Sequence, residues 1–164
     1  MGMIMEYMMI DKDAKKPDIE EIWELSEELE DDRVFDMDKL WDLVHTALVG
    51  KGTFAVDESL RSKAVMGNEF YEDADMFAAY TDYDCVKEIY QELKNIDLEK
   101  LKENFELENF CDEKVYLSVI FQRAGGDQEE IESLYNEIID AITELTEFYK
   151  KAVDEQCAVI ANMC

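Results

Sequence analysis

The segment DQEEIESLYNEIIDAITELTEFYKKA, residues 127–152, carries the strongest periodic signal in the chain. Its apolar residues recur every three or four positions, which is the spacing of one face of a helix. They are Ile131, Leu134, Tyr135, Ile138, Ile142, Leu145, Phe148, Tyr149 and Ala152. Gly125-Gly126 ends the preceding element, and Asp127-x-x-Glu130 is a helix-start signal. The segment is therefore predicted to form one amphipathic helix of about 25 residues.

Two short apolar segments, one near each end of the chain, are predicted to be strands. Residues 157–163 follow the long helix, and residues 3–10 are apolar on both alternating faces apart from Glu6. Apolar residues on both faces are typical of a strand in the interior of a sheet. Pairing the two strands with each other provides hydrogen-bond partners for the backbone N–H and C=O groups of both. We therefore predict a single α+β domain over residues 1–164: a small sheet that includes the N- and C-terminal strands, packed by several amphipathic helices.

Four further helices are predicted in residues 18–105, each starting at an aspartate that accepts hydrogen bonds from first-turn N–H groups. The first is expected to span about four turns, and Gly50 is expected to end the second. The predicted capping residues are Asp18, then Asp36 or Asp38, then Asp82, and Asp97.

The segments between these helices have weaker patterns. Residues 50–62 have the composition of a loop, residues 64–66 are predicted to be a short strand, and residues 68–81 an irregular excursion. The aromatic residues of segment 68–81, together with Tyr83, are expected to fold over the core. The alternative is that they form a loop that docks a partner. Residues 112–121 fit either a helix or a strand, because short apolar runs are ambiguous.

The charge of the chain excludes several classes of partner. Its 164 residues include 42 acidic and 16 basic side chains, for a formal net charge of −26, with 48% hydrophobic residues. The apolar content is that of a globular domain, so the charge does not indicate disorder. Both the first 60 residues (17 acids, 6 bases) and the rest (25 and 10) are acidic. We therefore expect no binding to nucleic acid or to anionic membranes, and a cationic protein or a small ligand as the partner.

Localisation, metals and cofactors follow from a few further counts. No apolar run approaches the roughly 20 residues of a membrane span, and residues 1–10 lack a basic signal-peptide start, so a cytoplasmic protein is expected. The four cysteines form no Cys-x-x-Cys pair and there is one histidine, so we expect reduced, mostly buried thiols and no Cys/His metal site. The pairs Asp73/Asp75 and Asp82/Asp84 do not continue into a calcium-binding loop. No cofactor and no metal is predicted.

Trp41, Asp42 and His45 are the candidate site residues. On a helix Trp41 and His45 share one face, and Asp42 and Asp38 extend a polar strip beside the indole. A carboxylate that accepts from one imidazole nitrogen raises the basicity of the other, which is the minimum for a general base. The structural alternative places Trp41 and His45 at the edge of the core. Catalytic nucleophile motifs are missing, and Cys85 serves as a nucleophile only if it lies near His45.

Three segments resemble the YfbM-like family, a group of small bacterial proteins of unknown function. They are residues 1–7 (MGMIMEY), residues 38–45 (DKLWDLVH) followed by Leu48 and Gly50, and residues 148–152 (FYKKA) followed by AVI at 158–160. The three segments occur in the family order and span nearly the whole chain. The resemblance implies a mixed α and β fold and carries no established activity.

These observations favour a non-enzymatic binding or interaction module. The first alternative is an enzyme or small-ligand-binding protein that uses a pocket at Trp41, Asp42 and His45; it requires these side chains to open into a cleft. The second is an acidic decoy of nucleic acid, which requires rows of carboxylates at the spacing of duplex phosphates.

Overall fold

The sheet is antiparallel and is organised around the C-terminal strand. The computed structural model describes residues 2–72 and 74–164, and in these the strand order is β2-β1-β5-β4-β3. The strands are β1 (Met5–Asp11), β2 (Val34–Asp36), β3 (Glu69–Phe70), β4 (Ala78–Thr81) and β5 (Cys157–Met163). β1 pairs with β5 along its whole length, from Met5 opposite Met163 to Asp11 opposite Cys157. The predicted pairing of the terminal strands is confirmed.

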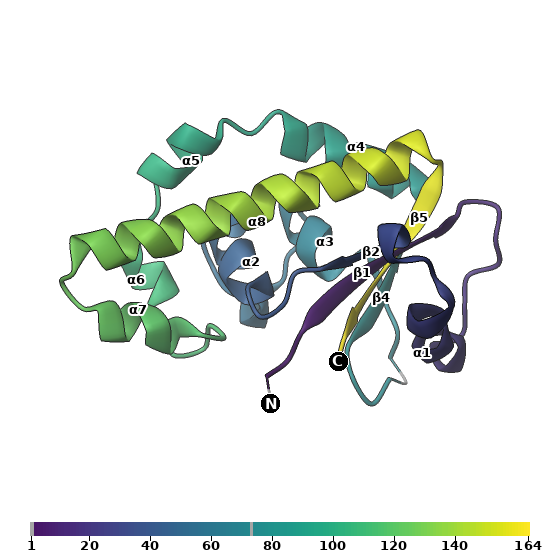
Figure 1. The fold of residues 1–164 in the computed structure, drawn as a ribbon, viewed down its shortest axis with the longest axis horizontal. Coiled ribbons are helices and arrows are strands. Elements are labelled where there is room, and N and C mark those ends of the chain that lie inside the picture. The colour runs from purple at the N-terminus through teal and green to yellow at the C-terminus, as the bar shows by residue number, and fades with distance from the viewer. Residues whose placement is uncertain (1, 73) are drawn as a thin grey trace.

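Eight α-helices lie in the same described ranges, and the long C-terminal helix dominates them (Figure 1). Helix α8 runs along one side of the molecule and turns directly into β5. The helices are α1 (Ile19–Glu28), α2 (Trp41–Val49), α3 (Leu60–Met66), α4 (Tyr83–Lys94), α5 (Leu98–Glu103), α6 (Leu107–Phe110), α7 (Ser118–Ala124) and α8 (Gln128–Asp154). The predicted α+β domain is therefore present.

The alternation of side chains along β1 divides the core into two parts. Met5, Tyr7 and Met9 face the main core, which they share with α2, α3, α4 and α8. Met8 and Ile10 face the other side of the sheet, where α1 covers them with Ile22. Successive side chains of a strand point to opposite faces, so a strand that is apolar throughout needs cover on both. The two-sided cover explains the continuous apolar run near the N-terminus.

Most predicted helix starts are confirmed by hydrogen bonds. The Asp127 carboxylate accepts from the N–H groups of Glu129 and Glu130 at the start of α8. Asp82 and Asp97 cap α4 and α5 in the same way. The Glu21 carboxylate accepts from the Asp18 N–H at 2.7 Å, as in a capping box, although α1 ends after about three turns rather than four.

The predicted strand at residues 64–66 is wrong, because these residues form the last turn of α3. Ser59 caps that helix, and Gly67 ends it with φ of +74°. A Cβ at Gly67 would lie 2.6 Å from the Ala79 Cβ, so only glycine permits this approach to β4. The last carbonyls of the helix accept hydrogen bonds from buried tyrosines: Tyr149 to Ala64 O and Tyr7 to Val65 O, both at 2.8 Å.

Three other expectations are corrected, and one open alternative is resolved. Residues 68–81 are not wholly irregular, because they contain β3 and β4, and β4 pairs with β5 over four residues. Helix α2 begins after Leu40 without a side-chain cap, and the Asp36 carboxylate instead accepts from the Asp38 N–H at 2.6 Å. The ambiguous segment 112–121 is a turn followed by the start of α7. Of the four cysteines only Cys157 is buried, while Cys85 and Cys111 are half-buried and Cys164 is exposed.

Candidate functional site

Helix α2 is buried on all sides, which sets the character of the candidate site. Every residue from Trp41 to Leu48 is buried, and Gly50, with φ of +88°, ends the helix as predicted. The neighbouring elements are α3, α5, α6 and α8. A helix enclosed in this way must hydrogen-bond each of its polar side chains internally. Asp42, His45 and Thr46 are those side chains.

The Asp42 carboxylate joins two loops to α2. It is 2% exposed, and its oxygens accept from the Thr53 N–H and from the Tyr116 N–H, each at 2.6 Å. A Cβ at Gly52 would lie 3.1 Å from the Asp42 Oδ1 and 2.8 Å from the Val115 Cγ2, so the glycine lets the first loop come this close. A buried carboxylate that accepts two backbone N–H bonds is a strong structural tie.

His45 is fully buried, and both of its ring nitrogens are occupied. Nδ1 lies 2.7 Å from the Lys51 carbonyl oxygen and Nε2 lies 2.7 Å from the Ser62 Oγ. A carbonyl only accepts, so Nδ1 carries the proton and Nε2 accepts from the Ser62 hydroxyl. The Ser62 oxygen in turn accepts from the Asp57 N–H at 3.3 Å. Ser62 is itself fully buried, so this serine–histidine pair has no exposed atom to offer a substrate.

We expect His45 to take up a proton at a lower pH in the folded protein than in the unfolded chain. Burial lowers the pKa of His45 below its ordinary value, and this outweighs the hydrogen bond to Lys51 and the nearby carboxylates. In the unfolded chain the imidazole takes up a proton near pH 6.5, so the stability contributed by neutral His45 is present above that pH and is lost as the pH falls below it. Because the chain has one histidine, its imidazole ¹⁵N and ¹H resonances report this group alone. A titration midpoint at or above 6.5 in the folded protein would contradict the geometry.

Trp41 and Asp42 lie at an open hollow of about 500 Å³ on the surface. The Trp41 ring stacks on Tyr116 with ring centroids 5.3 Å apart and planes 13° apart. Its indole Nε1 donates to the Met3 carbonyl oxygen at 3.1 Å. The residues that line the hollow come from the N-terminus, the start of α2, the loop after α2, and residues 113–119. His45 is not among them.

The rim of this hollow combines exposed apolar side chains with an unusual backbone conformation. Of the seven large apolar side chains exposed in the described residues, three line it: Met3, Phe54 and Val119, which are 41%, 48% and 41% exposed. Leu117, also in the lining, has φ of +66°, a conformation that few non-glycine residues adopt. Such strain persists only where the surroundings enforce it, and it is concentrated at functional sites. Here the hydrogen bond from the Tyr116 N–H to the Asp42 carboxylate fixes the residue that directly precedes Leu117.

The structure places the predicted site residues Trp41, Asp42 and His45 on one helix, but Asp42 and His45 bind different partners. Asp42 does not contact His45 through a hydrogen bond, and Asp38 is exposed outside the helix. Burial raises the pKa of Cys85, which disfavours a thiolate nucleophile, and neither ring nitrogen of His45 pairs with that thiol. Thr53, Ser62 and Tyr116 were missed; Thr53 and Tyr116 contribute backbone groups, which no side-chain pattern reveals.

Other candidate features have structural explanations. Tyr71 donates to the Pro17 carbonyl oxygen at 2.8 Å, and Tyr71 and Tyr80 pack beside α1, so this part of the aromatic segment folds over the core as expected. A second open hollow of about 690 Å³ is lined by the outer sides of Leu60 and α4 and contains none of the predicted site residues. Asp73, one member of the first Asp-x-Asp pair, lies outside the described residues.

Neither a metal-ligating cluster nor a helix able to span a membrane occurs among the described residues. No group of three or more His, Cys, Asp or Glu side chains is gathered closely enough to hold a metal ion. Of the helices between residues 2–72 and 74–164, none combines the length and apolarity that crossing a bilayer requires.

Comparisons with known proteins place the chain. The crystal structure of YfbM from Escherichia coli, a protein of unknown function, matches with a TM-score of 0.72 and 22% identity, covering 98% of this chain and 99% of that one. A search of curated proteins gave no match. A family model described as a domain of unknown function, DUF1877, matches residues 1–162. The resemblance to the YfbM-like family is thus confirmed, and the protein belongs to the DUF1877 family.

Proposed function

We propose that the protein is a non-enzymatic binding module and that the hollow beside α2 is its docking surface. The observation that carries the proposal is the Asp42 carboxylate, which fixes the loop at Thr53 and the segment at Tyr116 around an open hollow. This bond holds the exposed side chains of the rim in a preformed arrangement. A surface that is ordered before binding loses less entropy when its partner arrives.

The chemistry of the surface indicates a protein segment as the partner. The hollow is open, whereas sites for small molecules enclose most of the ligand surface. Its rim offers apolar contacts at Met3, Phe54 and Val119, and exposed apolar groups that are clustered mark interaction sites. The net charge of −26 attracts cationic groups and repels anionic ones. We therefore propose a segment that presents an apolar side chain next to lysine or arginine.

Panning a displayed library of random peptides on the folded protein tests this proposal. We expect the recovered peptides to combine an apolar or aromatic residue with basic residues, and to bind a Phe54→Ser variant at least about tenfold more weakly. Phe54 lies under the Lys114 ammonium, 5.2 Å from the ring centroid, on the surface of the loop. Binding constants from fluorescence anisotropy of labelled peptides measure the change.

Phe70→Ser is the matched control, because Phe70 is 50% exposed on β3 while Phe54 is 48% exposed. The control is expected to leave peptide affinity unchanged, and urea unfolding verifies that both variants are folded. Equal losses in the two variants, or no loss at Phe54, would remove the hollow as the docking surface.

The enzyme alternative has less support from this geometry. A general base needs an accessible lone pair within hydrogen-bond distance of the substrate. His45 is fully buried with both nitrogens bonded, and the Asp42 oxygens are taken by two backbone N–H groups.

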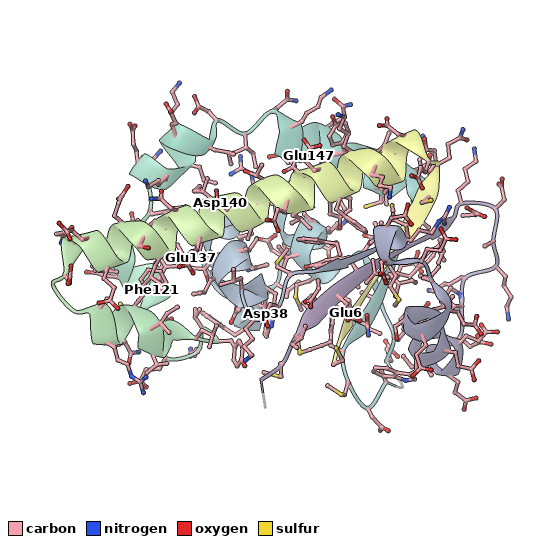
Figure 2. All side chains as sticks on the ribbon, in the orientation of Figure 1. Glu6, Asp38, Phe121, Glu137, Asp140 and Glu147 are labelled. Atoms are coloured by element: carbon pink, nitrogen blue, oxygen red, sulfur yellow. The ribbon has the colours of Figure 1, made fainter. Side chains whose placement is uncertain are left out.

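The acidic decoy is a second candidate because one helix face carries a row of carboxylates. Glu137, Asp140, Glu144 and Glu147 are exposed along one side of α8, and Figure 2 shows three of them along the helix. Positions three and four apart are neighbours on a helix, roughly 5–6 Å from each other. A DNA-binding protein that recognises this row would lose affinity when the four acids are changed to glutamine and would be insensitive to Phe54→Ser.

A further inference from the structure

Three polar side chains meet in one row across the sheet, on the face opposite the main core. Glu6 of β1 is the register partner of Asp36 on β2 and of Asn162 on β5. Register partners in adjacent antiparallel strands project from the same face of the sheet. The three side chains are therefore immediate neighbours, with Glu6 in the middle (Figure 2 labels Glu6).

Asn162 is the member of this row that needs a partner. It is 2% exposed, and its Oδ1 atom is buried without a hydrogen-bond partner among the residues that the structure describes. Leaving a buried amide oxygen unpaired costs about 1–3 kcal/mol, so such atoms normally have a protein group, a water or an ion beside them. The neighbour across the strand is a carboxylate, which is also only an acceptor when ionised.

The two carboxylates of the row repel each other. Glu6 and Asp36 form a directly opposed pair, and like charges in that arrangement are destabilising. Partial burial, followed by the Asp36 charge, raises the pKa of Glu6. Asp36 is exposed and keeps one oxygen on the Asp38 N–H. A cation would relieve the repulsion and also bind the amide oxygen.

We infer that Glu6, Asp36 and Asn162 form a binding site for a calcium ion at this end of the sheet. Adjacent strands lie about 4.8 Å apart, and Glu6 stands between the other two residues, so its longer side chain can reach an ion held by either neighbour. Ca²⁺ accepts irregular sets of carboxylate, amide and water oxygens, whereas Mg²⁺ demands a near-ideal octahedron. Glu6 supplies the third protein oxygen, and solvent completes the shell.

The spacing of these residues along the chain explains why the sequence did not indicate them. Positions 6, 36 and 162 belong to three strands and form no local motif. Only the register, which is set by the pairing of the terminal strands, brings them into one row. The site is independent of the docking surface proposed above and stands or falls separately.

Paramagnetic mapping with Mn²⁺ in place of Ca²⁺ tests the inference on the folded protein. At substoichiometric Mn²⁺ we expect the ¹⁵N–¹H signals of residues 5–7, 36 and 161–163 to broaden first, and excess Ca²⁺ to restore them. Such an acidic chain also attracts cations weakly over its whole surface. Broadening that is strongest along the acidic face of α8, or that is uniform, would overturn the inference.

Two substitutions at the row sharpen the test. Glu6→Gln is expected to weaken Ca²⁺ binding, measured by isothermal titration calorimetry, at least about tenfold, and it should not unfold the protein because it removes a like-charge contact. Asn162→Asp adds a third carboxylate and is expected to tighten binding and to make the melting temperature rise with Ca²⁺ concentration. Glu144→Gln on α8 makes the same charge change as Glu6→Gln and should have no effect. Unchanged affinity in both row variants would contradict a site here.

Discussion

Replacing Asp42 by asparagine is expected to lower the free energy of unfolding by about 3 kcal/mol, the largest effect of any substitution that preserves side-chain volume at the candidate site. The carboxylate accepts from two backbone N–H groups at 2.6 Å and is 2% exposed. Asparagine keeps one acceptor oxygen and turns an NH₂ group towards the second N–H donor. That donor then stays buried without a partner. Urea unfolding followed by circular dichroism measures the difference.

Asp38→Asn is the matched control for this prediction. Asp38 lies just before the same helix, is exposed, and has φ of +50°, a conformation that asparagine accommodates well. We expect a change within about 0.5 kcal/mol for this variant. Equal effects at positions 38 and 42 would show that Asp42 does not tie the two loops to α2.

Replacing His45 by alanine is expected to lower the free energy of unfolding by about 3–5 kcal/mol. The substitution leaves a cavity in a fully buried position, and it leaves the Lys51 carbonyl and the Ser62 hydroxyl without their partner. Ser62→Ala alone is expected to cost about 1–3 kcal/mol, because it leaves Nε2 unpaired. Both values come from the same urea titrations.

A double-mutant cycle distinguishes the hydrogen bond from general loss of packing. If His45 and Ser62 act as a pair, the combined variant will lose less than the sum of the single losses, by at least about 0.5 kcal/mol. Strict additivity would indicate that His45 stabilises the fold by volume alone and that the bond to Ser62 is of no energetic importance.

The elements that sequence reasoning predicted well are those with a long pattern or a local cap. Helix α8 has nine apolar positions at helical spacing, and its start at Asp127 depends on groups within three residues. Strand β5 was predicted because it is short and apolar and can pair with the N-terminal strand. The predictions for residues 64–66 and for β4 were wrong because neither segment has a long pattern or a local cap. Each is only a few residues long, and contacts with Tyr149, Tyr7 and β5 decide its conformation.

The candidate site shows the same division between local and distant information. Helical spacing correctly placed Trp41, Asp42 and His45 on one helix. The partners of their side chains lie elsewhere: Tyr116 is 74 residues from Asp42, and Ser62 is 17 residues from His45. Those distant groups decide whether Asp42 and His45 form one acid–base pair or two separate structural hydrogen-bond networks. No pattern within the helix contains that information.

Chemical-shift mapping with a peptide selected on the protein tests whether the hollow beside α2 is the docking surface. Adding the unlabelled peptide to ¹⁵N-labelled protein shifts the amide signals nearest to its binding surface. We expect the largest shifts at residues 53–54 and 114–119, around the hollow that Asp42 fixes. Largest shifts along residues 137–147 of α8, with the hollow unchanged, would contradict it and would instead favour recognition of the acidic helix face.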